Sequence, residues 1–242
     1  MRYSFDAIDD RPVVVAIGSF DGVHKGHRVL LDHLRSMSER LGARSVVVTF
    51  DPHPRIAMGR DGGMGLITTI EERALLLREA GIDNMVVAHF DEKFRSQGYE
   101  EFVERSLVAG LGMCGMIVGY NHRLGRGSEG NYERLMPLAE RCGFALECVA
   151  QHRVDDAKVS STVVRDVIRS GDMAHVKSLL GGDYVVTGVA CEGIVHISDS
   201  HKLLPPSGDY VATVNEKTAT ITIDNRSITL SEPISGGVVI RF

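Results

Sequence analysis

The sequence predicts an α/β protein: a Rossmann-like open parallel sheet with helices on both faces, followed by a small antiparallel β unit. Two patterns predict this fold. Between residues 13 and 182, short apolar runs alternate with segments of helical periodicity. After Gly182 the helical segments stop, and short β segments follow one another between turn residues. Alternation of the first kind is typical of right-handed β-α-β crossovers in a parallel sheet.

The predicted strands of the parallel sheet are apolar almost without interruption. Such runs are typical of strands that are covered on both faces. They are VVVAI at 13–17, SVVVTF at 45–50, NMVVAHF at 84–90, MCGMIVG at 113–119 and FALECVA at 144–150.

The segments between these runs have the spacing of amphipathic helices, and most end in or near a glycine, a common helix stop. We expect helices at 27–42, 71–81, 99–111 and 131–143, and two more at 161–171 and 172–181. The later β segments lie at 184–197, 208–215, 218–224, 226–230 and 236–242. The expected domains are therefore 1–183 and 184–242.

Composition narrows the class of protein. The 242 residues carry a formal net charge of −5, with 43% hydrophobic and 24% charged residues, which is ordinary for a soluble globular chain. There is no block rich in Lys and Arg, which argues against a nucleic-acid partner. No apolar run approaches the length of a membrane span, no secretion signal is evident, and the four cysteines form no C-x-x-C pair. We expect a cytoplasmic protein with reduced thiols and no membrane partner.

The segment GSFDGVHKGH at 18–27 joins the first predicted strand to the first predicted helix. A glycine-rich turn at this position directs backbone N–H groups and the positive end of the helix at whatever binds there. His24 and His27 lie three residues apart, so they share one face of the first helical turn. The segment therefore predicts a site for a polyanion, with a nucleotide triphosphate as the first candidate.

Three further segments follow predicted strands. In TFDPHPR at 49–55 two prolines bracket His53, which makes either a rigid loop or a rigid part of the site. GYNHRLGRGSEGN at 119–131 spells G-x-G-x-x-G, but it starts several residues past the strand, so it favours a glycine-rich flap over a dinucleotide fingerprint. In SSTVVR at 160–165 three hydroxyls and Arg165 form a helix cap or a phosphate cradle.

Together these motifs resemble the bacterial bifunctional riboflavin kinase/FMN adenylyltransferases, or FAD synthetases, of the H-x-G-H nucleotidyltransferase superfamily. The resemblance covers roughly residues 13–189. The G-x-N stem of the flap, Gly119 and Asn121, is part of the match. H-x-G-H alone indicates the superfamily, whereas H-x-G-H followed by T-F-D-P-H-P and S-S-T-x-x-R in this order indicates the flavin branch. P-loop, zinc-protease and G-x-S-x-G motifs are absent from the sequence.

The resemblance implies that the adenylyl group of ATP passes to FMN, giving FAD and pyrophosphate with Mg²⁺ and no covalent intermediate. It implies catalytic roles on the triphosphate for His24, His27 and Arg165. Implied nucleotide-binding residues are Gly18, Phe20, Asp21, Gly26, Asn121, Ser160, Ser161 and Thr162. Implied flavin-binding residues are Asp51, Pro52, His53 and Pro54. The ligands of Mg²⁺ and the oligomeric state stay open.

The chain departs from the family pattern in two places. The flap carries His122, Arg123, Leu124 and Gly125 where the family has F-x-F-G, which loses apolar or stacking surface for a flavin. Residues 202–215 and the final VVIRF resemble remnants of the kinase module, but the G-F-P-T-A-N segment is missing, so we expect no riboflavin kinase activity. Two alternatives stay open: an adenylyltransferase for another phosphate acceptor, and a non-catalytic flavin or nucleotide sensor.

Overall fold

The computed structural model describes residues 1–60, 62–150 and 159–242. By its internal contacts the chain forms two compact units, which we describe separately. The first comprises Met1–Phe20, His27–Gly62 and Leu77–Arg153, and the second comprises Asp21–Gly26, Gly63–Leu76 and Val154–Phe242. Among the described helices, none is both long and apolar enough to cross a membrane.

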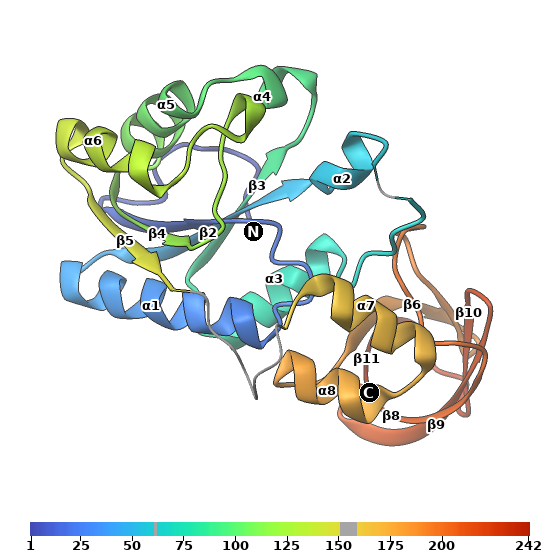
Figure 1. Ribbon diagram of the computed structural model, residues 1–242. Coiled ribbons are helices and arrows are strands. Elements are labelled where there is room, and N and C mark those ends of the chain that lie inside the picture. Colours follow the sequence, from blue (N-terminus) through green and yellow to red (C-terminus); the bar gives the residue numbers. More distant parts are fainter. Residues whose placement is uncertain (61, 151–158) are drawn as a thin grey trace. The chain divides into compact units, whose positions relative to one another are not determined.

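The first unit is built on a parallel five-stranded sheet in the order β3-β2-β1-β4-β5 (Figure 1). The strands are β1 (Val13–Ile17), β2 (Arg44–Asp51), β3 (Asn84–His89), β4 (Met113–Gly119) and β5 (Ala145–Val149). Each predicted strand is confirmed to within two residues at either end. From β1 the chain adds β2 and β3 on one side of the sheet and then β4 and β5 on the other side. The carboxyl end of β1 therefore lies at the topological switch point, where ligands of such sheets bind.

Helices cover both faces of this sheet. Those that bury side chains against it include α1 (Lys25–Leu41) and α6 (Tyr132–Cys142). The remaining helical segments up to β5 are α2 (Pro54–Ala57), α3 (Ile70–Glu79), α4 (Glu92–Ser96), α5 (Tyr99–Glu101) and the 3-10 turn η2 (Arg126–Ser128). Val13 and Val15 of β1 belong to a buried cluster with Leu135 and Leu138 of α6. On the other face, α1 buries Leu34 and Met37. The alternation of side chains along β1 therefore supplies a core on each face.

One predicted helix differs from the expectation. The spacing of apolar residues over 99–111 predicts one α-helix, but α5 passes at Phe102 into η1, a π-helical segment (Phe102–Gly110). The amide of Leu111 donates to the carbonyl of Ser106, five residues earlier. This wider winding brings Phe102 and Leu107, five residues apart, to one buried face.

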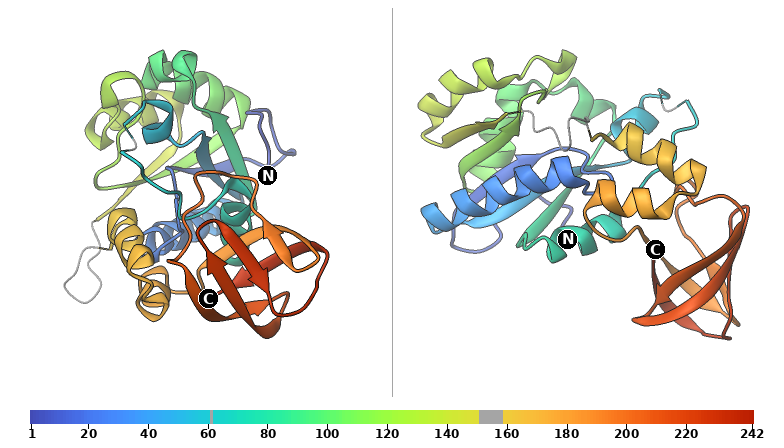
Figure 2. Two further views of the ribbon diagram at one scale, coloured as in Figure 1. Left: turned by 90° about the vertical axis from the view of Figure 1, so that its right-hand side faces the viewer. Right: turned by 60° about the horizontal axis from the view of Figure 1, so that its bottom comes forward.

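The second unit contains a closed six-stranded barrel in the order β10-β7-β6-β11-β8-β9, drawn in orange and red in Figure 2. Its strands are β6 (Val185–Cys191), β7 (Ile194–His196), β8 (Gly208–Val214), β9 (Lys217–Asp224), β10 (Ser227–Leu230) and β11 (Gly236–Arg241), and all six are antiparallel to their partners. The predicted antiparallel β unit is confirmed. Its closure removes the exposed edges that an open sheet of this size would carry.

Two helices precede the barrel and share its core: α7 (Ser161–Ser170) and α8 (Met173–Leu180). Val164 and Ile168 of α7 are fully buried in the same cluster as Ile221 and Ile240 of the barrel. The predicted division into domains 1–183 and 184–242 stays a prediction.

Candidate functional site

The turn after β1 has an unusual backbone. Phe20 and Val23 have φ values of 46° and 43°, and Gly22 between them has a φ of 88°. The left-handed region is costly for a β-branched residue such as valine, so surrounding contacts must hold this turn in place. Glycine is needed at position 22 because an added Cβ would also come within 2.8 Å of the Ile67 side chain.

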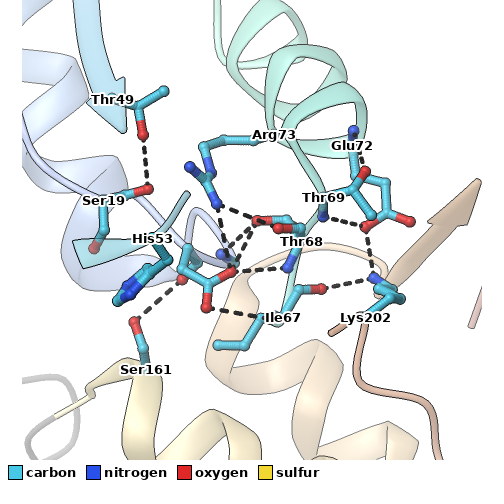
Figure 3. Close-up of polar contacts among 12 residues, drawn as sticks. Ser19, Thr49, His53, Ile67, Thr68, Thr69, Glu72, Arg73, Ser161 and Lys202 are labelled. Carbon is cyan, nitrogen blue, oxygen red and sulfur yellow. Dashed lines mark hydrogen bonds and ion pairs between the residues drawn. The ribbon is translucent and has the colours of Figure 1, made fainter. Parts of the chain in front are cut away.

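Asp21 is the centre of a buried polar cluster in the second unit. Figure 3 shows Ile67, Thr68 and Arg73 of this cluster. The Asp21 carboxylate is fully buried and accepts hydrogen bonds from the backbone amides of Ile67 and Thr68 at 3.2 and 2.8 Å. The Thr68 hydroxyl donates to it as well, at 3.1 Å. Two guanidiniums complete the cluster: Arg165 pairs with Oδ2, and Arg73 lies 3.9 Å from Oδ1.

Burial alone would raise the pKa of Asp21. The charges of Arg73 and Arg165 and the backbone donors outweigh that effect and hold the pKa below its ordinary value. Asp21 is therefore ionised, and its side chain faces protein donors. The predicted contact of Asp21 with the nucleotide stays a prediction.

The start of α7 contacts the same turn. The Ser161 hydroxyl donates to the Asp21 carbonyl at 3.1 Å, and the N-cap Ser160 accepts from the Val163 amide. Arg165, one turn later, is buried and donates through Nε to the Gly65 carbonyl at 2.8 Å. Thr162 is exposed. The structure thus brings Ser161 and Arg165 to the Asp21 turn, where α7 also presents the positive end of its dipole.

His24 lies immediately before α1 and is 6% exposed. Burial lowers its pKa to about 4, although the Asp21 carboxylate acts in the opposite direction. His24 is therefore a neutral imidazole near pH 7. A neutral imidazole has one N–H donor and one acceptor nitrogen, so a neutral His24 ring donates a single hydrogen bond at a time.

This burial predicts a pH dependence of stability. The folded pKa of His24 lies below the ordinary value of 6.5, so the unfolded chain binds the proton first as the pH falls. The free energy of unfolding should therefore decrease between pH 6.5 and about 4, by roughly 3 kcal/mol from this residue. Urea denaturation across that range checks this. His24→Asn should show a flatter decline, and parallel curves for the two proteins would contradict the burial of a neutral His24.

His27 belongs to the first turn of α1 in the first unit, where it is half-buried. Its ring lies against Phe20, with 5.1 Å between the ring centroids. The Phe20 ring in turn covers Gly18, where an added Cβ would come within 3.2 Å of it. The strand end is held by the Thr49 hydroxyl, which donates to the Ser19 carbonyl at 3.0 Å. Gly18 and Phe20 thus support the position of the His27 ring.

The predicted flavin segment forms the start of α2. His53 is its N-cap: Nδ1 accepts a hydrogen bond from the Arg55 amide at 3.2 Å, and Pro54 occupies the first helical position. The ring is 8% exposed and Asp51 is exposed. Capping thus fixes the orientation of the His53 ring, in agreement with the rigid loop that the flanking prolines, Pro52 and Pro54, predict. The role of these residues in flavin binding stays a prediction.

The flap at 119–131 closes on itself through two backbone hydrogen bonds between Leu124 and Gly130. Cβ atoms at Gly125 and Gly130 would come within 2.5 and 2.8 Å of Tyr99, so these glycines serve close packing. Asn121 is exposed, whereas Leu124 is buried in the core of the first unit. Burial lowers the pKa of His122 to about 4, so that ring is neutral too.

Sequence reasoning missed several residues of the Asp21 cluster. Thr68 and Arg73 surround Asp21, and Glu72 forms an ion pair with Lys202 at 2.6 Å. One local signal was available: T-x-x-E at 69–72 is a capping box, and it forms here. No short-range pattern indicates Arg73 or Lys202.

The described residues do not form a cage for a metal ion. They contain no group of three or more His, Cys, Asp or Glu side chains that could hold one. The carboxylate of the turn, that of Asp21, already accepts hydrogen bonds from protein N–H groups. Mg²⁺ commonly binds through substrate phosphates with few protein ligands, so the side chains described here are not assigned to it.

The family model for FAD synthetase matches residues 6–163. A bifunctional riboflavin kinase/FMN adenylyltransferase from Haemophilus influenzae is 31% identical over 180 residues, which cover 74% of this chain and 58% of that protein. One from Pseudomonas fluorescens is 30% identical over 217 residues, covering 86% and 70%. The chain thus spans about six to seven tenths of the length of these curated relatives.

A solved structure has the same fold. The crystal structure of a protein described as a macrolide-efflux protein from Streptococcus pneumoniae matches with a TM-score of 0.83, over 100% of this chain and 88% of that one. At 21% sequence identity this likeness concerns the fold alone.

Proposed function

The chain belongs to the FAD synthetase family, and from that premise we propose that it transfers the adenylyl group of ATP to FMN, giving FAD and pyrophosphate. The observation that carries the proposal is the family match over residues 6–163, which includes the H-x-G-H turn, the T-F-D-P-H-P segment and the start of α7. The contact between the turn and α7, through Ser161 and Arg165, supports it.

The reaction needs few protein groups. A phosphate oxygen of FMN attacks the α-phosphorus of ATP and forms the new P–O bond. The bond from the α-phosphorus to the bridging oxygen breaks, and pyrophosphate leaves with that electron pair. Because negative charge builds on the leaving pyrophosphate, catalysis consists mainly of positioning and of directing N–H and O–H donors at its oxygens.

The residues of the turn and of α7 suit that task. His24, neutral at pH 7, and His27, one helical turn later, each donate an N–H to the polyphosphate. The positive end of α7 and its hydroxyls, Ser160 to Thr162, provide further donors. Arg165 uses Nε and Nη2 on the Gly65 carbonyl and on Asp21, so we assign its phosphate contact to the remaining N–H groups.

Mg²⁺ enters this proposal with ATP, as charge neutralisation on the phosphates. No protein ligand is assigned to it, and each step above depends on the donors of the chain itself. The exposed Asn121 is proposed to contact the nucleotide, and the segment from Asp51 to Pro54 the flavin.

A second candidate is the same transfer to a different phosphate acceptor. The flap favours it, because Leu124 points into the core and the two aromatic side chains of the family pattern are replaced by His122 and Leu124. A flap without those rings offers less surface for an isoalloxazine.

We further propose that the chain lacks riboflavin kinase activity. The six barrel strands of the second unit are present, but the sequence between β6 and β8 contains no G-F-P-T-A-N segment. The barrel therefore retains the framework of a kinase-like module without that part of its site.

Chromatography of the reaction products tests all three proposals. We expect FAD and pyrophosphate from FMN, ATP and Mg²⁺, and no FMN from riboflavin, ATP and Mg²⁺. A panel of other phosphate acceptors in place of FMN tests the second candidate. Binding of FMN or ATP without release of pyrophosphate would overturn the proposed transferase and favour a sensor, and formation of FMN from riboflavin would overturn the proposed loss of the kinase.

A further inference from the structure

Lys202, in the connection between β7 and β8, has a fully buried ammonium group in the second unit. Its Nζ donates to the Ile67 and Val185 carbonyls, each at 2.7 Å, and to Oε2 of Glu72 at 2.6 Å. The ring of Tyr184 lies 4.3 Å from Nζ. These three acceptors match the three N–H donors of an ammonium, so the group is fully satisfied away from water.

Such a pair is a costly way to stabilise a fold. Burial lowers the pKa of Lys202 even though Glu72 acts to raise it, so desolvation is the larger effect. Buried ion pairs can often be replaced by apolar side chains without loss of stability, and some are retained because they specify one geometry. The Lys202–Glu72 pair therefore indicates that the backbone around it must keep one geometry.

That part is the loop at 65–69, which ends where α3 begins. Glu72 accepts from the Thr69 amide at 2.9 Å through the oxygen that also binds Lys202. The Thr69 hydroxyl accepts from the Glu72 amide at 3.2 Å, which completes the capping box. The other Glu72 oxygen accepts from the Thr187 amide of β6 at 2.8 Å.

The backbone joins the same loop to the Lys202 segment. The Leu66 amide donates to the His201 carbonyl at 2.7 Å, and the Leu203 amide donates to the Leu66 carbonyl at 2.8 Å. Gly65 packs so closely that an added Cβ would lie 2.8 Å from the Cβ of Leu203. One edge of the loop is thus held by residues 201–203, which belong to the predicted β unit.

The opposite edge of the loop holds the turn. Amides of Ile67 and Thr68 donate to Asp21, and the Gly22 amide donates to the Thr68 hydroxyl at 3.0 Å. The Gly65 carbonyl accepts from Arg165. Figure 3 shows Lys202 donating to the Ile67 carbonyl, and the amide of the next residue, Thr68, donating to a carboxylate, which is that of Asp21.

We propose that Lys202 is a positioning residue for adenylyl transfer: from the β unit it holds the 65–69 loop, and the loop holds the Asp21–Gly26 turn that carries His24. The inference rests on the proposed function. It assigns the β unit a role in the transferase site, although the unit lacks the kinase motif. Because Gly22 and Val23 have positive φ values, a loosened loop lets the turn relax and moves the His24 ring.

The test uses the full chain with Lys202→Met and Glu72→Gln combined. The single change Lys202→Met would leave the Glu72 carboxylate buried and unpaired, so loss of folding could hide its effect. In the double variant neither of the two side chains is charged. Position 72 keeps a side-chain carbonyl for the capping box, and the Ile67 carbonyl loses the ammonium that donates to it. Ile223→Ala, in the barrel core, is the matched control, because it lowers the melting temperature without touching the ion pair.

We expect kcat to fall by about 10- to 100-fold in the double variant, the scale of a misplaced reacting group, with the KM for FMN unchanged. Hydrogen exchange should accelerate at the amides of residues 22, 67 and 68, because their acceptors lose their fixed positions. Ile223→Ala should leave kcat and these amides as in the wild type at a temperature where it is folded.

The outcomes separate the two proposals. No FAD from the wild type overturns the proposed function, and the exchange measurement then still decides the role of Lys202. An active wild type with unchanged kcat and unchanged exchange in the double variant overturns the positioning role. A fall in kcat without faster exchange in the turn, or an equal fall in Ile223→Ala, also overturns it.

Discussion

Turnover should fall by about 10²–10³-fold when His27 is replaced by alanine, the loss that follows removal of one donor to a transition state. His27 lies one helical turn beyond His24, and its ring is oriented by Phe20. The negative charge on the leaving pyrophosphate grows as the reaction proceeds, so the donor matters more in the transition state than in the bound substrate. The fall is therefore expected in kcat, measured as pyrophosphate release at saturating ATP and FMN.

A histidine on the same helix provides the control. His33 is exposed and pairs with Glu147 of β5, so His33→Ala removes an imidazole from α1 without touching the turn. Its turnover should match that of the wild type. His27→Asn, which keeps an N–H donor of different reach, should lie between the wild type and His27→Ala. Wild-type turnover in His27→Ala would remove this residue from the mechanism.

Asp21→Asn should lower the free energy of unfolding by about 3–5 kcal/mol, the cost of removing one partner from a buried ion pair. The guanidiniums of Arg73 and Arg165 would lose the carboxylate between them, and the new amide group would face the donors of Ile67 and Thr68. FAD formation should be abolished as well, because the carboxylate holds the turn. Urea denaturation measures the first effect and chromatography of FAD the second.

Acidification should weaken the contribution of Asp21 to the free energy of unfolding. The pKa of Asp21 lies below its ordinary value of 3.8, so its stabilising contribution is complete above that pH and is lost as the pH falls through the lower folded value. Asp166→Asn is the control, since Asp166 is an exposed acid on α7 that pairs with Arg169 at 3.3 Å. Little change in its stability is expected. Wild-type stability in Asp21→Asn would show that the cluster does not depend on the carboxylate.

Local patterns sufficed for most of the secondary structure. The runs at 13–17 and 113–119 coincide with β1 and β4, because a strand covered on both faces needs apolar side chains at nearly every position. The glycine stops also form as predicted: Gly143, Gly171 and Gly181 are left-handed C-caps with φ of 73°, 82° and 69°. These features depend on contacts within a few residues of the chain.

Those local patterns could not predict which strands pair when they lie far apart in the sequence. The closure of the barrel depends on β10 pairing with both β7 and β9, and alternation along one strand does not specify its partners. The π-helical segment after Phe102 was equally hidden, because Phe102, Val103 and Leu107 also fit an ordinary amphipathic helix.

The parallel sheet, the β unit, the family and the motifs at the strand ends could all be predicted from the sequence, because each depends on residues that lie close together along the chain. Two features became apparent only in the folded chain: the Asp21 carboxylate faces protein donors, and Lys202 and Glu72 are buried together. A buried charge must be compensated by whichever groups the fold brings to it, and those groups can lie far away along the chain. For Asp21 those groups belong to Ile67, Thr68 and Arg165, which lie 46, 47 and 144 positions further along the chain.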